Sequence, residues 1–177
     1  HQARQLGVDA HVIRLGVDHA RFVATPRPSE PVVLLIGGYK PRKNTVFVRA
    51  LWPRVVARVP RVRLIEVGQG RRVSDQAMAG LYQAARVVAF PSLLEGFGLP
   101  VLEAMASARP VVCSNLGALP EFGAASTLAL EPALWIDSLV AYLTEASRWK
   151  HAAEANLVRS LAYSWDQTAA EMIECLT

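Results

Sequence analysis

Short apolar runs alternate with amphipathic segments along the whole chain, and this alternation limits the folds that are open to it. The apolar runs are rich in β-branched residues and bounded by Gly, Pro or Asn, which is typical of β-strands. Six strands are predicted, at residues 11–15, 31–37, 62–68, 86–92, 110–115 and 126–130. Because the runs are almost continuously apolar rather than alternating, they predict a parallel sheet that is covered on both faces.

Helical patterns separate these strands. The segments predicted to be helical are 44–58, 74–85, 100–108, 132–147, 150–162 and 165–176. Asn44, Ser74 and Ser164 stand where N-cap residues are expected, while Pro53 is expected to kink or restart its helix. Strands and helices in this order predict a Rossmann-like α/β fold, with a doubly wound parallel sheet and right-handed crossovers.

The composition agrees with one domain over residues 1–177. The chain is 52% hydrophobic, yet no apolar run reaches the roughly 18 residues that a membrane span needs, and we find no signal peptide. The net charge of +4 comes from scattered arginines, without the interleaved exposed aromatic residues of a nucleic-acid surface. Cys113 and Cys175 predict neither a disulfide framework nor a metal cluster, so a reducing, cytoplasmic setting is expected.

Three loops follow predicted strands at the edge where a parallel sheet binds its ligands, at residues 37–44, 67–72 and 91–100. The third loop contains Gly96 and Gly98, which allow a tight turn and a close approach of a ligand to the backbone. The next helix begins near Leu99. Its first N–H groups and the positive end of its dipole predict a phosphate site.

Two acids bracket the same loop, Glu95 before the glycines and Glu103 in the helix. Glu103 is placed to accept hydrogen bonds from the hydroxyls of a ribose beside the phosphate. Glu95 lies on the other side of the phosphate, where a carboxylate can bind sugar hydroxyls or stabilise positive charge at a reacting carbon. The alternative is an ordinary strand-to-helix turn with acids at the helix start, which the two acids around Glu-Gly-Phe-Gly-Leu-Pro disfavour.

The stretch FPSLLEGFGLPVLEAMASARPVVCSNLGALPEF (90–122) resembles the signature of the retaining glycosyltransferases of family 4, the "group 1" glycosyltransferases. The E-x7-E spacing, the EAMA that follows and the S-N-x-G-A-L-P-E turn match in order. Other matching pieces are VIRLGVDHARF (12–22), LLIGGYKPRKN (34–44), SDQAMAGLYQAARVVAFPS (74–92) and SWDQTAAEMIECL (164–176). The resemblance therefore runs from about residue 11 to residue 176.

The resemblance implies the C-terminal, donor-binding half of a two-domain GT-B-type glycosyltransferase. Such an enzyme transfers a hexose from a nucleotide diphosphate sugar to a glycan or lipid-linked acceptor, with retention and through an oxocarbenium-like state. In the family the first acid of the motif contacts the donor sugar and the second binds the ribose. This gives Glu95 the catalytic role and Glu103 the ribose, which is the division that the loop itself predicts.

The resemblance also implies the other donor contacts. Lys43 matches the lysine that neutralises the diphosphate. The remaining implied donor-binding positions are Gly37, Gly38, Gly96, Phe97, Gly98 and Leu99, with the backbone of the last two holding the phosphates. No metal and no cofactor is expected, because the lysine and the helix end supply the positive charge.

Two departures from the family pattern stand out. The position of a frequent family arginine is Gly38 here, so phosphate binding rests on Lys43 with Arg42. The segment between the V-G-x-G turn and the next helix is also much shorter than in the family, and we expect that a loop is missing near residues 70–73. The family's nucleobase contacts follow that segment, which makes Val73 a candidate for packing against the base.

Several alternatives stay open at this stage. One is a nucleotide-sugar epimerase or a phosphorylase of the same fold, and another is a non-catalytic nucleotide-sugar-binding or assembly module. The N-terminal acceptor domain is expected to belong to a longer protein, about twice the present length. The basic charge leaves peripheral association with the inner face of a membrane open. The sugar, the base and the acceptor are not predicted. Arg109 is expected at an exposed turn.

Overall fold

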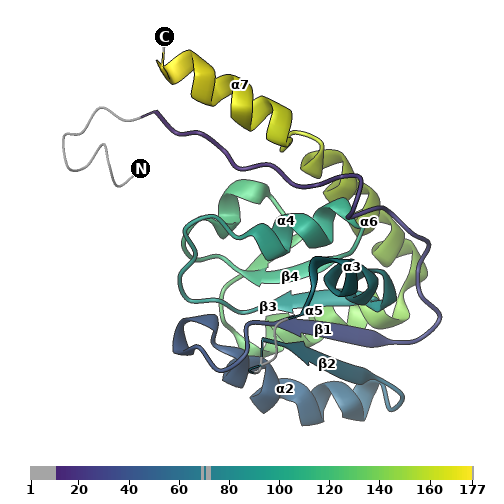
Figure 1. The fold of residues 1–177 in the computed structure, drawn as a ribbon. Coiled ribbons are helices and arrows are strands. Elements are labelled where there is room, and N and C mark those ends of the chain that lie inside the picture. Colours follow the sequence, from purple (N-terminus) through teal and green to yellow (C-terminus); the bar gives the residue numbers. More distant parts are fainter. Residues whose placement is uncertain (1–10, 69, 71–72, 177) are drawn as a thin grey trace.

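The computed structural model describes residues 11–68, 70 and 73–176 (Figure 1). Within this part a parallel sheet has the strand order β2-β1-β3-β4-β5. The strands are β1 (Val32–Ile36), β2 (Arg63–Val67), β3 (Val87–Phe90), β4 (Val111–Ser114) and β5 (Ser126–Leu128). The predicted α/β fold with a parallel sheet is confirmed.

Helices cover both faces of the sheet, as Figure 1 shows for α3 and α4 on one side and α2 and α5 on the other. The helices are α2 (Thr45–Arg58), α3 (Asp75–Ala84), α4 (Leu99–Ala106), α5 (Pro132–Thr144), α6 (Ala146–Ser160) and α7 (Trp165–Leu176), with short 3₁₀ turns η1 (Pro41–Lys43) and η2 (Leu119–Phe122). Ser74 and Ser164 act as the predicted caps, since their hydroxyls accept from the backbone N–H of Ala77 and Gln167.

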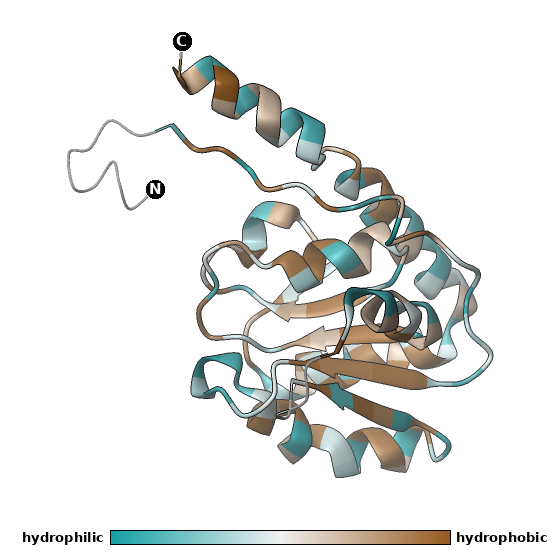
Figure 2. Ribbon diagram, in the orientation of Figure 1, coloured by the Kyte–Doolittle hydropathy of each residue, from teal (hydrophilic) through white to brown (hydrophobic). Residues whose placement is uncertain are grey.

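Each face of the sheet builds its own hydrophobic core. Along β1, Val33 and Leu35 pack with α2 and α5, whereas Leu34 and Ile36 pack with α3 and α4. Every residue of β1 is therefore buried, as the continuous apolar run predicted. The apolar strands contrast with the mixed surfaces of the helices in Figure 2.

The strand predicted at residues 11–15 is wrong. This segment runs beside α7 in Figure 1, and the sheet does not include it. Its backbone pairs with α7 side chains instead: the Thr168 hydroxyl donates to the carbonyl of Arg14 over 2.7 Å. The side chain of Val12 is 72% exposed, so the apolar run has no sheet face to bury it. Among the described residues, a single β-bridge forms near this segment, between Val17 and Ser164.

Several element bounds also differ from the predictions. One helix runs from Thr45 to Arg58 through Pro53 and does not restart there. Asn44 occupies its N-cap position with a left-handed φ of 50°, but its side chain makes no capping hydrogen bond. Helix α5 ends at Thr144 and α6 begins at Ala146, so Glu145 separates the two helices earlier in the chain than predicted.

Arg109 is fully buried, which overturns its prediction as an exposed turn residue. Its guanidinium donates to the carbonyls of Thr25 and Pro26 over 3.0 and 3.2 Å, and it lies 5.6 Å from the ring of Trp149. Burial lowers the pKa of Arg109 to about 10. The fold therefore uses this cation to hold backbone from a distant part of the chain.

Arg86 also holds distant backbone. It lies just before β3, the strand next to β4, which Arg109 precedes. Its guanidinium donates to the carbonyls of Pro28 and Leu143 over 2.9 and 2.7 Å. Together the two arginines fix residues 25–29, called the strap below, along the N-terminal edge of the sheet. None of the helices in the described part of the chain combines the length and the apolar character that a membrane span requires.

Candidate functional site

The carboxyl ends of β1 and β3 lie at the switch point of the sheet, where the strand order reverses. From β1 the chain adds β2 on one side, and it then crosses back to add β3 on the other side. In open α/β sheets ligands bind in the crevice at such a point. Two of the predicted loops meet here. The backbone N–H of Leu93 donates to the carbonyl of Arg42 over 2.7 Å, and the Ser92 hydroxyl reaches the same carbonyl over 3.1 Å.

An ion pair joins the two loops. Lys43 Nζ lies 2.6 Å from Glu95 Oε1, and the two side chains are only 13% and 8% exposed. The Ser92 hydroxyl also donates to Glu95 Oε1, and Lys43 Nζ lies 4.6 Å from the ring centre of Phe90. Arg42 is a looser and more exposed partner, with 3.5 Å between Nη1 and Glu95 Oε2. The structure thus brings the predicted catalytic acid and the predicted phosphate lysine into direct contact.

The first glycine pair shapes the floor of this site. Gly37 and Gly38 have φ values of 151° and 62°, and Gly38 packs against the backbone of Gly68. A Cβ at position 38 would lie 1.8 Å from the carbonyl oxygen of Gly68, so no side chain fits there. The arginine that the family often carries at this position is therefore excluded by the way the loops after β1 and β2 pack together.

The second glycine pair splits into two roles. Gly98 has a φ of 105°, and a Cβ there would lie 2.6 Å from Leu119 Cδ2. Gly96 has open space around its Cα, so it is the one that leaves room for an approaching group. Phe97, between them, turns its ring into an aromatic cluster with Phe122 at 5.2 Å, which leaves mainly its backbone for a ligand. Helix α4 begins at Leu99, next to the predicted start.

Glu103 lies one turn further along α4 in a different environment. Its Oε2 accepts a hydrogen bond of 2.8 Å from the hydroxyl of Tyr82, whose side chain is fully buried. Burial raises the pKa of the Glu103 carboxyl, the Tyr82 hydrogen bond lowers it, Asp75 raises it and Arg21 lowers it, with a net shift upward. The carboxylate is therefore partly desolvated and is held by a neutral donor rather than by a salt bridge.

A small cavity of about 160 Å³ lies against Glu103 and Leu99. Arg21 forms part of its wall and binds Asp75 at the start of α3 over 2.9 Å. Asp18 is a turn-forming residue, since its carboxylate accepts from the backbone N–H groups of Ala20 and Arg21.

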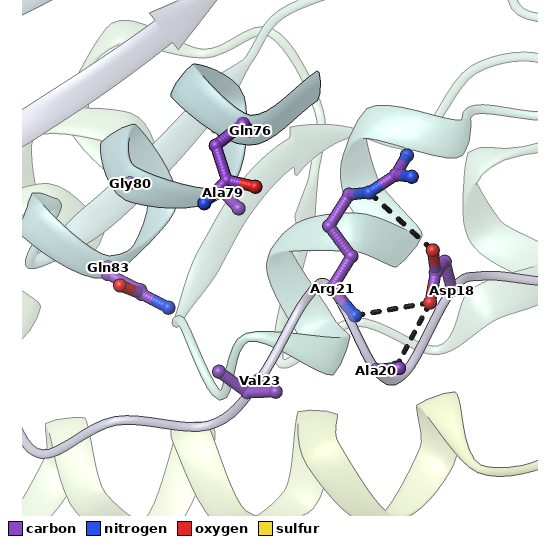
Figure 3. A pocket seen from close by; sticks show the side chains of 8 residues that line it. All are labelled: Asp18, Ala20, Arg21, Val23, Gln76, Ala79, Gly80 and Gln83. Atoms are coloured by element: carbon purple, nitrogen blue, oxygen red, sulfur yellow. Dashed lines mark hydrogen bonds and ion pairs between the residues drawn. The ribbon is translucent and has the colours of Figure 1, made fainter. Parts of the chain in front are cut away.

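A wider hollow of about 520 Å³ is also lined by Arg21 (Figure 3). The turn at residues 18–23 supplies one wall of this hollow. The facing residues of α3 supply the other wall, and they are Gln76, Ala79, Gly80 and Gln83.

Val73 is half-buried just before α3, and no side-chain contact identifies a role for it. The prediction of a missing loop near residues 70–73 falls on positions 71 and 72, which lie outside the described residues, and it stays a prediction. No group of three or more His, Cys, Asp or Glu side chains in the described part could hold a metal ion.

Four side chains or backbone positions of the site were not predicted. Ser92 and Tyr82 hold the two acids, and Arg21 forms the wall beside Glu103. Gly117 packs on the Glu95 backbone, where a Cβ would lie 2.8 Å from the Glu95 oxygen. Ser92 lies in the predicted loop 91–100, three positions before Glu95. Tyr82, Arg21 and Gly117 also lie in segments that match the family pattern, but their roles depend on contacts across the fold.

Solved structures share this fold. Sucrose-phosphate synthase from Thermosynechococcus elongatus has a TM-score of 0.79 and 20% identity, over 98% of this chain and 54% of that one. Anabaena Alr3699/HepE, solved in complex with UDP and glucose, has a TM-score of 0.76 and 18% identity, over 98% of this chain and 59% of that one.

Curated relatives match in sequence. O-antigen chain mannosyltransferase B of Escherichia coli is 37% identical over 105 residues, which is 57% of this chain and 27% of that protein. D-inositol 3-phosphate glycosyltransferase of Nocardia farcinica is 30% identical over 181 residues, or 83% of this chain and 40% of that protein. The chain thus spans less than half the length of these two relatives.

The family described as "Glycosyl transferases group 1" matches residues 30–145. This range begins before β1 and ends after α5, so it contains Lys43, Glu95 and Glu103 together with the sheet that positions them. The chain therefore belongs to the group 1 glycosyltransferases.

Proposed function

We propose that this chain is the donor-binding domain of a retaining family 4 glycosyltransferase that moves a hexose from a nucleotide diphosphate sugar to a glycan or lipid-linked acceptor. The observation that carries the proposal is the contact of Lys43 with Glu95 at the switch point of the sheet, beside the start of α4. A cation, a carboxylate and the backbone at the start of α4, at one edge of the sheet, match the parts of a sugar diphosphate.

The residues divide the donor between them. Lys43 and the backbone of Gly98 and Leu99 bind the diphosphate, and Glu103 binds the ribose hydroxyls. Glu95 faces the sugar. In the structure Glu95 and Lys43 neutralise each other across 2.6 Å. A diphosphate that takes over Lys43 leaves the Glu95 carboxylate available to sugar hydroxyls and to positive charge on the ring.

The reaction then needs little covalent chemistry from this domain. The bond between the anomeric carbon and the phosphate oxygen breaks, and the diphosphate leaves with the electron pair. The acceptor oxygen bonds to the same carbon on the same face, and its proton passes to the leaving phosphate. Lys43 and the α4 N–H groups stabilise the charge that develops on the leaving group. This chemistry calls for neither a metal nor a cofactor.

Acceptor binding is assigned to a further N-terminal domain of a longer protein, in a cytoplasmic setting that is open to peripheral contact with the inner face of a membrane. The relatives named above act in mannosyl transfer to an O-antigen chain and in glycosyl transfer to D-inositol 3-phosphate, as their names state. They support a hexose donor and a polyhydroxylated acceptor without selecting one.

Calorimetry tests the division of roles, with UDP, GDP and their glucose and mannose conjugates as ligands. Glu103→Ala is expected to weaken binding of the bare nucleotides. Glu95→Ala removes the carboxylate that competes with the diphosphate for Lys43, so it is expected not to weaken their binding, and it lowers turnover in the full-length enzyme. Equal losses of nucleotide affinity in both variants would refute the division. If the unchanged chain binds none of the ligands, an assembly module without donor binding becomes the better description.

A further inference from the structure

The hydroxyl of Tyr82 has a purpose that packing does not explain. The Tyr82 side chain is fully buried, and its ring meets the ring of Phe22 edge to face at 5.7 Å. A phenylalanine would pack equally well at this position. A buried hydroxyl needs a partner, and this one reaches Glu103 Oε2 over 2.8 Å and the carbonyl of Pro100 over 3.1 Å.

The single hydroxyl proton favours the carboxylate over the carbonyl. A hydrogen bond to a charged acceptor is shorter and stronger than one to a neutral carbonyl, in line with the two distances. Burial and the neighbouring Glu103 charge raise the pKa of Tyr82 well above its ordinary value. The phenol therefore remains protonated at neutral pH and donates to the ionised Glu103.

Among the described residues, Tyr82 gives the Glu103 carboxylate the one side-chain hydrogen bond recorded for it. That bond occupies Oε2 and leaves Oε1 for another donor. Glu103 and Leu99 border the 160 Å³ cavity, so a ligand in that cavity lies against the Glu103 side chain. Tyr82 itself does not border it, because its ring lies in the core beneath.

We propose that Tyr82 is a positioning residue for the donor site: its buried hydroxyl fixes one carboxylate oxygen of Glu103, so that the other oxygen is presented to the ribose hydroxyls of the nucleotide. The assignment of Glu103 to those hydroxyls rests on the proposed function. The pinning of Glu103 by Tyr82 rests on the geometry alone, and the two parts are tested separately.

The charged groups around Glu103 make this role measurable as a titration. Burial favours the protonated acid, while the Tyr82 hydrogen bond and the Arg21 charge favour the carboxylate, and the Asp75 charge opposes it. Asp18 also borders the cavity. When the Tyr82 hydroxyl is removed, burial and the Asp75 charge still favour the protonated acid, and among the described residues the Arg21 charge is left to oppose them. Glu103 therefore takes up its proton at a higher pH.

The experiment compares Tyr82→Phe with Tyr142→Phe. Tyr142 is a matched control, because its side chain is also buried and its hydroxyl makes one recorded bond, of 2.7 Å, to Ser126 in the core on the other face of the sheet. The carboxyl resonance of Glu103 is followed by NMR in protein labelled with ¹³C-glutamate, and is assigned by its loss in Glu103→Gln. UDP and GDP affinities are measured across the same pH range.

Tyr82→Phe is expected to raise the titration midpoint of Glu103 and to weaken nucleotide binding about tenfold, because a displaced Glu103 no longer accepts a hydrogen bond from the ligand and one bond to a charged acceptor is lost. Tyr142→Phe leaves both quantities unchanged, whatever it does to thermal stability. An unchanged Glu103 midpoint in Tyr82→Phe would overturn the inference even if nucleotides bind. A raised midpoint in a chain that binds no nucleotide would uphold the pinning of Glu103 and sink the proposed function.

Discussion

Lys43 and Glu95 form the ion pair on which the proposed donor site depends, and they are 52 positions apart in the chain. Neither side chain is more than 13% exposed, so each would carry a poorly hydrated charge without the other. Arg42 stands next to Lys43 but is 48% exposed and lies farther from Glu95. The two neighbouring cations therefore differ in what they contribute, and this difference can be measured.

Lys43→Met is expected to lower the free energy of unfolding by about 2–3 kcal/mol, because it leaves the Glu95 carboxylate without its cation. Arg42→Met is expected to change it by less than about 0.5 kcal/mol, as usual for an exposed and loosely placed partner. Urea unfolding at neutral pH measures both. Adding Glu95→Gln to Lys43→Met should recover most of the lost stability. Equal losses in Lys43→Met and Arg42→Met would show that the contact of Lys43 with Glu95 contributes no more than that of Arg42.

Removing the charge of Glu103 is expected to raise the free energy of unfolding, whereas removing the charge of Lys43 lowers it. Its pKa is raised in the folded chain, so the native state binds this proton more readily than the unfolded chain does. Its contribution to stability is therefore best below the ordinary carboxyl pKa of about 4.3 and is lost as the pH rises through the native value.

Glu103→Gln is expected to raise the free energy of unfolding at pH 7.5, on the order of 1 kcal/mol, because it removes the ionisation penalty and keeps an oxygen for Tyr82. Near pH 4 the gain should disappear. Urea titrations at the two pH values give the comparison, and a variant that is less stable than the parent at pH 7.5 would contradict the assignment of a desolvated carboxylate.

At the scale of the elements, the two glycines of the loop before α4 serve different purposes. Gly98 is required by the backbone conformation and packing, whereas Gly96 leaves space for a ligand. Gly98→Ala is expected to cost about 2–4 kcal/mol, because it places a side chain at a φ of 105° and against Leu119. Gly96→Ala should stay within about 0.5 kcal/mol, since open space surrounds that position. Thermal unfolding of the two variants distinguishes them, and a large loss for Gly96→Ala would mean that both glycines serve the fold.

The core strands could be predicted because their apolar runs carry the signal locally. Residues 32–36 and 87–90 are buried on both faces, so each position in the run is constrained by the same requirement. The run at 11–15 also contains β-branched and aliphatic residues, but it includes His11 and Arg14, it is not part of the sheet, and α7 takes its backbone bonds. Composition measures how well a segment fits a sheet, whereas the presence of a neighbouring strand is a property of the whole fold.

The site shows the same limit. Glu95, Glu103 and the glycines could be proposed because they lie within one short stretch, and the lysine because its loop resembles that of a family. Tyr82 could not, since it lies 21 positions before Glu103 on a different helix and looks like an ordinary apolar position of α3. Arg109 was placed on the surface because nothing in its neighbourhood shows the carbonyls that bury it.

At the scale of the whole molecule, α7 stands apart from the two cores. Thr168 is its one buried residue, and Trp165, Met172 and Ile173 are roughly half exposed or more. Figure 1 shows α7 beside residues 11–16, away from the sheet. The cooperative unit is therefore the sheet with α2 to α6.

Truncation after Ser164 is expected to leave one cooperative unfolding transition and to shift its midpoint by less than about 4 °C. Hydrogen exchange in β1 and β3 should keep the protection of the full chain, while residues 11–16 lose theirs together with their partner helix. Broad, non-cooperative melting of the truncated chain would show that α7 is part of the folding unit.

The contacts of the strap determine which positions at this edge of the sheet tolerate substitution. Arg86 and Arg109 grip it mainly through the carbonyl oxygens of Thr25, Pro26 and Pro28. Every amino acid supplies a carbonyl, so the strap's own identities can change while the grip persists. The two arginines have no such freedom, because a lysine lacks the planar fork that reaches several oxygens at once. Natural variation at this edge should therefore gather in the held segment and spare the residues that hold it.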